Sequence, residues 1–81
     1  MMRPYTPKQI AVLKTLVAHP AGLTPTEIGQ LNDKPYYGAS AWANSALKRL
    51  ISDNLVTKTA RSYMPTKAGR SLVAELNEDA A

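Results

Sequence analysis

The sequence predicts a mainly α-helical fold of the α+β class, with one small β-hairpin, in the order helix, helix, helix, strand, strand, helix. Three observations predict it. Apolar residues recur at helical spacing in several stretches, and two Thr-Pro pairs mark helix starts. A short segment rich in β-branched residues lies before the last helical stretch. The 81 residues suffice for one domain, 1–81, in which we expect 1–5 and 77–81 to fray.

Hydroxyl residues followed by proline open the first two helices. Thr6 is expected to cap the first helix, which ends where Pro20 and Gly22 stop helical propagation, with His19 in its last turn. Thr24 and Glu27 have the spacing of a capping box, which predicts a short second helix ending near residue 30 or 31. A loop over 32–38 should follow, longer and more aromatic than the usual turn of a helix-turn-helix motif.

The third helix is expected over about residues 40–53. Its apolar positions fall on one side, and its polar positions collect on the other at 3.6 residues per turn. Ser40 is a candidate cap for its start, and Asn54 is a plausible left-handed residue at its end.

A hairpin over 55–64 should follow, with its turn at 60–62, and Pro65 closes the returning strand. Thr66 then caps the last helix, whose Leu72, Val73 and Leu76 point inward.

The net charge of +4 is unevenly distributed. Residues 34–74 hold seven Lys or Arg and one Asp, a charge of +6, whereas the last seven residues contribute −3. A basic segment of this kind is typical of proteins that bind a phosphate backbone, although solvated surface lysines and arginines would give the same totals.

Composition excludes several function classes. The chain has no cysteine and one histidine, so we expect no metal site, no cofactor and no enzymatic activity. Its acidic residues are scattered over different elements, which disfavours paired acid–base catalysis. No apolar stretch is long enough to span a membrane, and the N-terminus lacks a signal peptide, so we expect a cytoplasmic, basic binding protein.

Three sequence passages resemble the winged helix-turn-helix core of MarR-like and PadR-like bacterial transcriptional regulators. They are G-L-T-P-T-E-I-G at 22–29, L-K-R-L-I-S-D-N-L-V at 47–56 and Y-M-P-T-K-A-G-R at 63–70. Asn54 stands where the family pattern has glycine, and Met64-Pro65 replaces its usual Tyr-x-Leu. The regulators also have long helices for dimerisation and ligand sensing, for which we expect little room here, so effector sensing is not carried over.

The resemblance implies a sequence-specific double-stranded DNA-binding module, a small transcriptional regulator in which the third helix enters the major groove and the hairpin acts as the wing. Arg49 is the best candidate for reading a guanine edge and Asn44 for an adenine edge, while Lys48, Lys58 and Arg61 suit phosphates or the minor groove. The candidate DNA-binding residues are Tyr37, Ser40, Trp42, Asn44, Ser45, Lys48, Arg49, Ser52, Lys58 and Arg61.

Other interpretations stay open at this point. The polar candidates are also consistent with an ordinary solvated surface, and we expect Trp42 to pack against the Tyr36–Tyr37 loop rather than on a partner. A homodimer on a two-fold site would increase specificity, with the first helix and the C-terminal tail as the candidate contacts. Alternatively, the aromatic 36–42 surface docks the domain on a larger protein complex, which includes complexes that bind nucleic acid.

Overall fold

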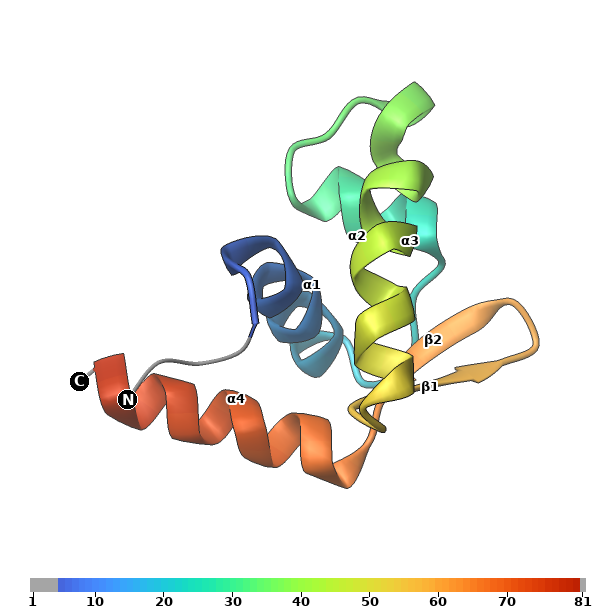
Figure 1. Cartoon of the computed structure of the whole chain (residues 1–81). Helices are drawn as coiled ribbons and strands as arrows, with labels where there is room; N and C mark the ends of the chain where they lie inside the picture. Colours follow the sequence, from blue (N-terminus) through green and yellow to red (C-terminus); the bar gives the residue numbers. More distant parts are fainter. Residues whose placement is uncertain (1–4, 81) are drawn as a thin grey trace.

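The structure is a computed structural model that describes residues 5–80 of the chain, and side chains for residues 5–77. Its elements follow the predicted order: α1 (Pro7–Ala18), α2 (Pro25–Leu31), α3 (Tyr36–Ser52), β1 (Val56–Thr59), β2 (Ser62–Pro65) and α4 (Lys67–Ala80). The predicted fold class is therefore confirmed. Figure 1 shows α3 lying between α1 and the hairpin, with α4 running beneath them.

Local capping explains why the first two helices begin where they do. The side chains of Thr6 and Thr24 each accept a hydrogen bond from the backbone N–H three residues later. The side chains of Gln9 and Glu27 in turn each accept one from the backbone N–H of the capping threonine. This reciprocal arrangement satisfies two of the N–H groups that a helix start leaves unpaired. In the capping box of α2, the hydrogen bond that the Thr24 N–H donates to the Glu27 carboxylate holds the pKa of Glu27 below its ordinary value.

The turn between α2 and α3 is shorter than the sequence predicts. Asp33 adopts a left-handed φ of 64°, and the amides of Asp33 and Lys34 bond to the carbonyls of Gln30 and Gly29. This pair of bonds is a Schellman motif, which ends α2 and reverses the chain within residues 32–35. The expected 32–38 loop is therefore wrong, and the turn has the length of an ordinary helix-turn-helix turn.

The third helix accordingly starts at Tyr36 rather than near Ser40, after an extended Pro35 that provides no side-chain cap. Ser40 lies inside the helix, so its expected role as a cap is also wrong. Close packing of the helices decides this start: Gly29 is buried so tightly against Ala39 that a Cβ there would lie 2.4 Å from the Ala39 carbonyl oxygen. Tertiary contact thus overrides the weak helix propensity of a Tyr-Tyr-Gly run.

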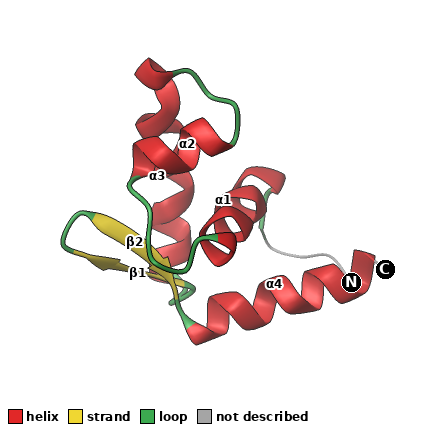
Figure 2. Cartoon of the chain, turned by 180° about the vertical axis from the view of Figure 1, so that it is seen from behind, coloured by secondary structure: helices red, strands yellow, loops and turns green. Residues whose placement is uncertain are grey.

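At its other end, α3 closes with a second Schellman motif that leads into the hairpin. Asn54 has the predicted left-handed conformation, with φ of 63°, and the Leu55 amide bonds to the Leu50 carbonyl. Strands β1 and β2 then pair antiparallel, with Lys58 opposite Tyr63. We call this hairpin, residues 56–65, the wing; its strands are yellow in Figure 2.

A contact that the sequence analysis missed anchors the wing to the helices. Leu23, just before α2, exchanges two backbone hydrogen bonds with Tyr63 of β2, which adds an isolated antiparallel bridge to the small sheet. The wing is therefore fixed to the start of the helix-turn-helix unit as well as to the end of α3.

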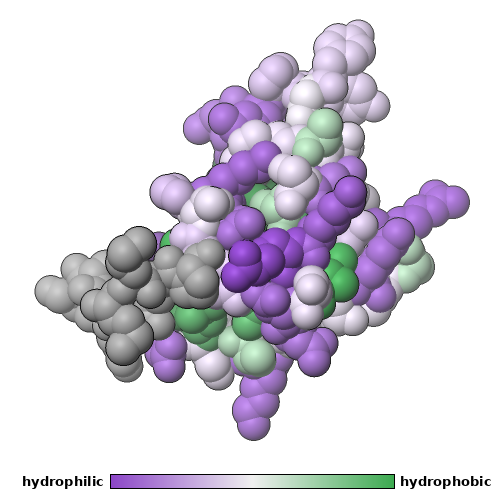
Figure 3. Space-filling view, viewed as in Figure 1, coloured by the Kyte–Doolittle hydropathy of each residue, from purple (hydrophilic) through white to green (hydrophobic). Residues whose placement is uncertain are grey.

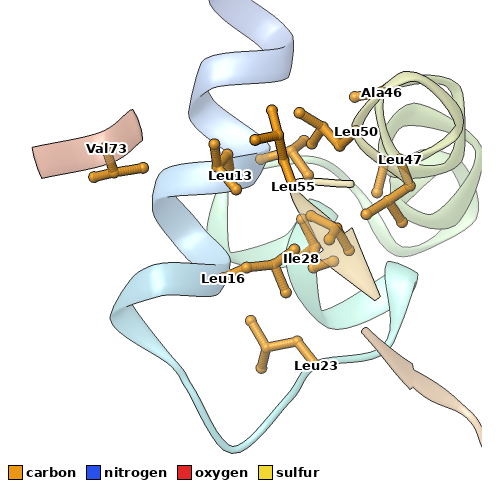
Figure 4. Packing of buried hydrophobic residues seen from close by; sticks show 12 residues of the cluster. Leu13, Leu16, Leu23, Ile28, Ala46, Leu47, Leu50, Leu55 and Val73 are labelled. Carbon is orange, nitrogen blue, oxygen red and sulfur yellow. The ribbon is translucent and has the colours of Figure 1, made fainter. Parts of the chain in front are cut away.

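The hydrophobic core draws on all four helices and on the wing, as Figure 4 shows for its larger side chains. Leu13 and Leu16 of α1 pack with Ile28, with Leu47 and Leu50 of α3 and with Val73 of α4. Thr66 caps α4 as predicted by accepting a bond from the Gly69 N–H. That helix continues to Ala80; residues 1–4 and 81 of the expected tails lie outside the described residues.

Candidate nucleic-acid interface

Helix α3 is divided between a core side and an outward side. Its core side consists mainly of small residues, and the buried positions are Ala39, Ala43, Ala46, Leu47 and Leu50. The outward side is exposed and polar at Asn44, Lys48 and Ser52. The helix therefore presents a row of hydrogen-bonding groups to solvent without burying any of them.

On the flank of α3 that faces the wing, a hollow of about 350 Å³ separates the helix from β2. It is lined by Asn44, Leu47, Lys48, Ile51 and Tyr63. Lys58 extends over the ring of Tyr63, with its Nζ 5.7 Å from the ring centroid. Arg61 is exposed at the wing's turn, beside the left-handed Ala60.

The opposite flank of α3 faces the start of α1. Lys8 of α1 donates a hydrogen bond from Nζ to the Ser45 hydroxyl, which itself donates to the carbonyl of Trp42. Trp42 is half-buried against the core, and the ammonium groups of Lys8 and Lys34 lie 5.3 and 5.2 Å from its ring centroid. The exposed rings of Tyr36 and Tyr37 instead contact each other edge to face, with centroids 5.7 Å apart.

Farther along this flank, Arg49 belongs to a three-residue cluster. Its Nε donates to Asp53 Oδ2 at 2.8 Å, the Tyr5 hydroxyl donates to the same oxygen at 2.7 Å, and the guanidinium lies 4.9 Å from the Tyr5 ring centroid. The bonds from Arg49 and Tyr5 hold the pKa of Asp53 below its ordinary value, and the bond to Asp53 raises the pKa of Tyr5. The guanidinium is therefore partly neutralised and lies against Tyr5, just before the start of α1.

The structure thus distributes the predicted residues over three surfaces. The flank facing the wing brings Asn44 and Lys48 beside Tyr63, over whose ring Lys58 lies, whereas Arg61 is exposed at the wing's turn. The flank facing α1 holds Trp42, Ser45 and Arg49. The outward face includes Tyr37 and Ser52, and Ser40 is half-buried. Sequence reasoning missed Lys8, Tyr5 and Tyr63, whose contacts with α3 join distant parts of the chain. The one sequence signal for Lys8 is a positive charge in the first turn of a helix, where the dipole disfavours it.

Of the cationic side chains over α3 and the wing, Arg49 is paired with a carboxylate, that of Asp53. Figure 3 shows hydrophilic side chains gathered over these elements. Among the residues that the structure describes, no group of three His, Asp or Glu side chains could hold a metal ion. Within the same residues no helix has the length and apolar character needed to cross a membrane.

Comparison with known structures identifies the fold. The chain resembles the crystal structure of MepR, a transcription regulator of the Staphylococcus aureus multidrug efflux pump MepA, with a TM-score of 0.80 and 22% sequence identity over 94% of the chain. The matched region spans 58% of the MepR chain. The chain therefore has the winged helix fold that its sequence passages predict. No family model matches the sequence, and no curated protein matches it in sequence.

Proposed function

We propose that this chain is a sequence-specific double-stranded DNA-binding module of a transcription regulator, with α3 in the major groove and the wing against the neighbouring backbone. The observation that supports it most directly is the exposed polar side of α3, flanked by the cationic wing, in a fold shared with a transcription regulator. A helix of about 10–12 Å diameter fills a major groove of about 12 Å width.

In this arrangement, the residues of α3 have different tasks. Asn44 lines the hollow between α3 and the wing, and its side-chain amide can form hydrogen bonds with both hydrogen-bonding atoms of an adenine edge. Lys48 is the exposed α3 cation nearest the wing and suits a phosphate. Arg49 must exchange Asp53 for DNA before it can read a base, so we assign the first base contact to Asn44.

The wing supplies the second contact. Lys58 lies over the ring of Tyr63, and Arg61 is exposed at the turn, so both cations project from the hairpin. Basic side chains placed in this way are attracted to the negative potential of a narrow minor groove.

The test is a fluorescence anisotropy titration of the full chain against labelled duplexes of random and genomic sequence at two salt concentrations. We expect binding at low salt that weakens steeply as salt rises. Replacing the wing arginine by glutamate, Arg61→Glu, should abolish it, whereas the matched control Lys14→Glu, on an exposed part of α1, should bind like wild type. Asn44→Ala should cost about 1–3 kcal/mol on the preferred sequence and reduce discrimination.

Absence of binding to any duplex at low salt would refute the proposal. Equal binding to all duplexes would refute its sequence specificity. We also expect two copies to occupy a two-fold related site, which sedimentation of the complex measures directly.

A second candidate function rests on the aromatic pair at the start of α3. Tyr37 is 97% exposed and Tyr36 is 67% exposed, although each is large and partly apolar. Exposed aromatic groups of this kind often anchor protein–protein contacts. If the domain docks on a protein complex, Tyr37→Ala should abolish that association and Arg61→Glu should leave it intact; with DNA as the partner, Arg61→Glu has the larger effect.

A further inference from the structure

Two lysine ammonium groups from different parts of the chain meet at one indole ring. Lys8 comes from α1 and Lys34 from the turn before α3, yet both lie within 5.3 Å of the ring centroid of Trp42. The additional bond from Lys8 to Ser45 ties the same group to α3. Three elements, α1, the turn before α3 and α3 itself, are thus needed to assemble this cluster. We call the cluster of Lys8, Lys34 and Trp42 the Trp42 clamp.

Two features of the free protein oppose the position of these charges. Lys8 is in the first turn of α1, where the helix dipole disfavours a cation, and two ammonium groups beside one ring repel each other. Among the side chains of residues 5–77, neither group has a carboxylate within ion-pairing distance. The ring attracts both cations, but it leaves their charge available to a further anion.

The location of the clamp indicates what that anion is. The clamp lies beside the flank of α3 that bears Ser45, whereas Lys58 and Arg61 lie beyond the opposite flank. Figure 1 shows α3 between the start of α1 and the wing, and the reversed view in Figure 2 agrees. A helix inserted in the major groove has one phosphate strand along each side, so cations on both flanks match a double-stranded polyanion.

We propose that Lys8 and Lys34, positioned by Trp42, bind the DNA phosphate strand on the side of α3 opposite the wing. This inference rests on the proposed function and adds a second backbone contact to it. The ring holds two long side chains in place before DNA arrives, which lowers the entropy lost on binding. Because phosphates recur in every sequence, the clamp contributes affinity and orientation rather than base discrimination.

The test compares wild type with the double variant Lys8→Gln/Lys34→Gln in anisotropy titrations of a labelled random-sequence duplex over a range of salt. Loss of two phosphate contacts should reduce the magnitude of the slope of log K against log salt by about 1.8. The affinity ratio of wild type to variant should therefore fall about twelvefold between roughly 50 and 200 mM salt. Lys14→Gln is the matched control and should keep the wild-type slope.

Three further measurements separate the effect of charge from an effect on structure. Lys8→Arg/Lys34→Arg keeps both cations and should restore the slope, and thermal unfolding should show each variant folded. Trp42 is the single tryptophan of the chain, so its emission should change when DNA phosphates pair with the ammonium groups beside its ring, and less so in the glutamine variant.

The outcomes distinguish the two proposals. If wild type binds no duplex at low salt, the proposed function fails. If wild type binds and the folded glutamine variant keeps its slope, the clamp is overturned while the proposed function stands. A restored slope in the arginine variant, with a changed emission of Trp42 in wild type, supports the clamp.

Discussion

Substituting alanine at two glycines, Gly29 and Gly38, should change stability in opposite directions. At Gly29 the added Cβ would lie 2.4 Å from the carbonyl oxygen and 2.6 Å from the Cα of Ala39. Backbone atoms cannot rotate away, so α2 must move from α3 across their large shared contact. Overpacking of this kind costs about 1–3 kcal/mol. Movement of a whole helix belongs at the upper end, and after the helix-propensity gain of about 1 kcal/mol we expect Gly29→Ala to destabilise by about 2 kcal/mol.

Gly38 provides the matched control on the neighbouring helix. A Cβ there meets no atom within 4 Å, and the residue is already helical. Gly38→Ala should therefore stabilise by about 0.5 kcal/mol, because alanine loses less entropy on folding. In thermal unfolding followed by circular dichroism, the Tm should fall by about 10 °C for Gly29→Ala and rise by about 3 °C for Gly38→Ala. A Tm for Gly29→Ala at or above that of wild type would refute the reasoning that α2 and α3 are fixed by this contact.

Three further predictions concern the cluster of Tyr5, Arg49 and Asp53, the cap of α2 and the hydrophobic core. Arg49 and Tyr5 lower the pKa of Asp53 in the folded chain, so ionised Asp53 stabilises the folded state at pH values above its unfolded pKa. This stabilisation is lost as the pH falls through the folded pKa of Asp53. The urea midpoints of wild type and Asp53→Asn should therefore converge over that pH range. Thr24→Ala removes the cap of α2 and should cost about 1 kcal/mol in urea unfolding, and rescue to wild-type stability by Thr24→Ser tests the role of the hydroxyl. Leu50→Ala, at a side chain only 1% exposed, should cost about 2–5 kcal/mol, and a smaller loss would mean that the core collapses around the site.

Features fixed by neighbours in the sequence could be predicted. The caps at Thr6, Thr24 and Thr66 each involve a bond to the residue three positions later, and Asn54 needs only a local left-handed turn. The hydrophobic periodicity likewise identified the first, third and last helices. These signals depend on short-range chemistry, and the structure confirms them.

The start of α3 could not be predicted in the same way, because it depends on packing. Pro35 offers no side-chain cap, and the run from Tyr36 favours a loop by propensity alone. What selects the helix is the contact of Gly29 with Ala39 together with the tight turn at Asp33. Nothing in the local sequence reports how close two helices will come.

In the candidate interface too, features set within one helix could be predicted, whereas contacts between elements could not. Helical periodicity correctly placed Lys48 and Asn44 on exposed positions of α3, and the four-residue spacing of Arg49 and Asp53 suits an ion pair. Contacts with residues outside the helix could not be predicted in this way, since Tyr5, which bonds to Asp53, is 48 residues away in the sequence. Whether a cation is available to DNA or already engaged depends on such partners, so the sequence identifies candidates but does not rank them.

The alanines of α3 connect its packing with its proposed role. Ala39, Ala43 and Ala46 are buried where longer side chains would hold α3 away from its neighbours. Small side chains on the core side let helices approach closely, and this approach brings Lys8 of α1 to the hydroxyl of Ser45. The same packing that buries one side of α3 therefore sets the position of the cations beside its other side. A substitution in the core can shift the proposed DNA contacts without replacing any residue that touches DNA.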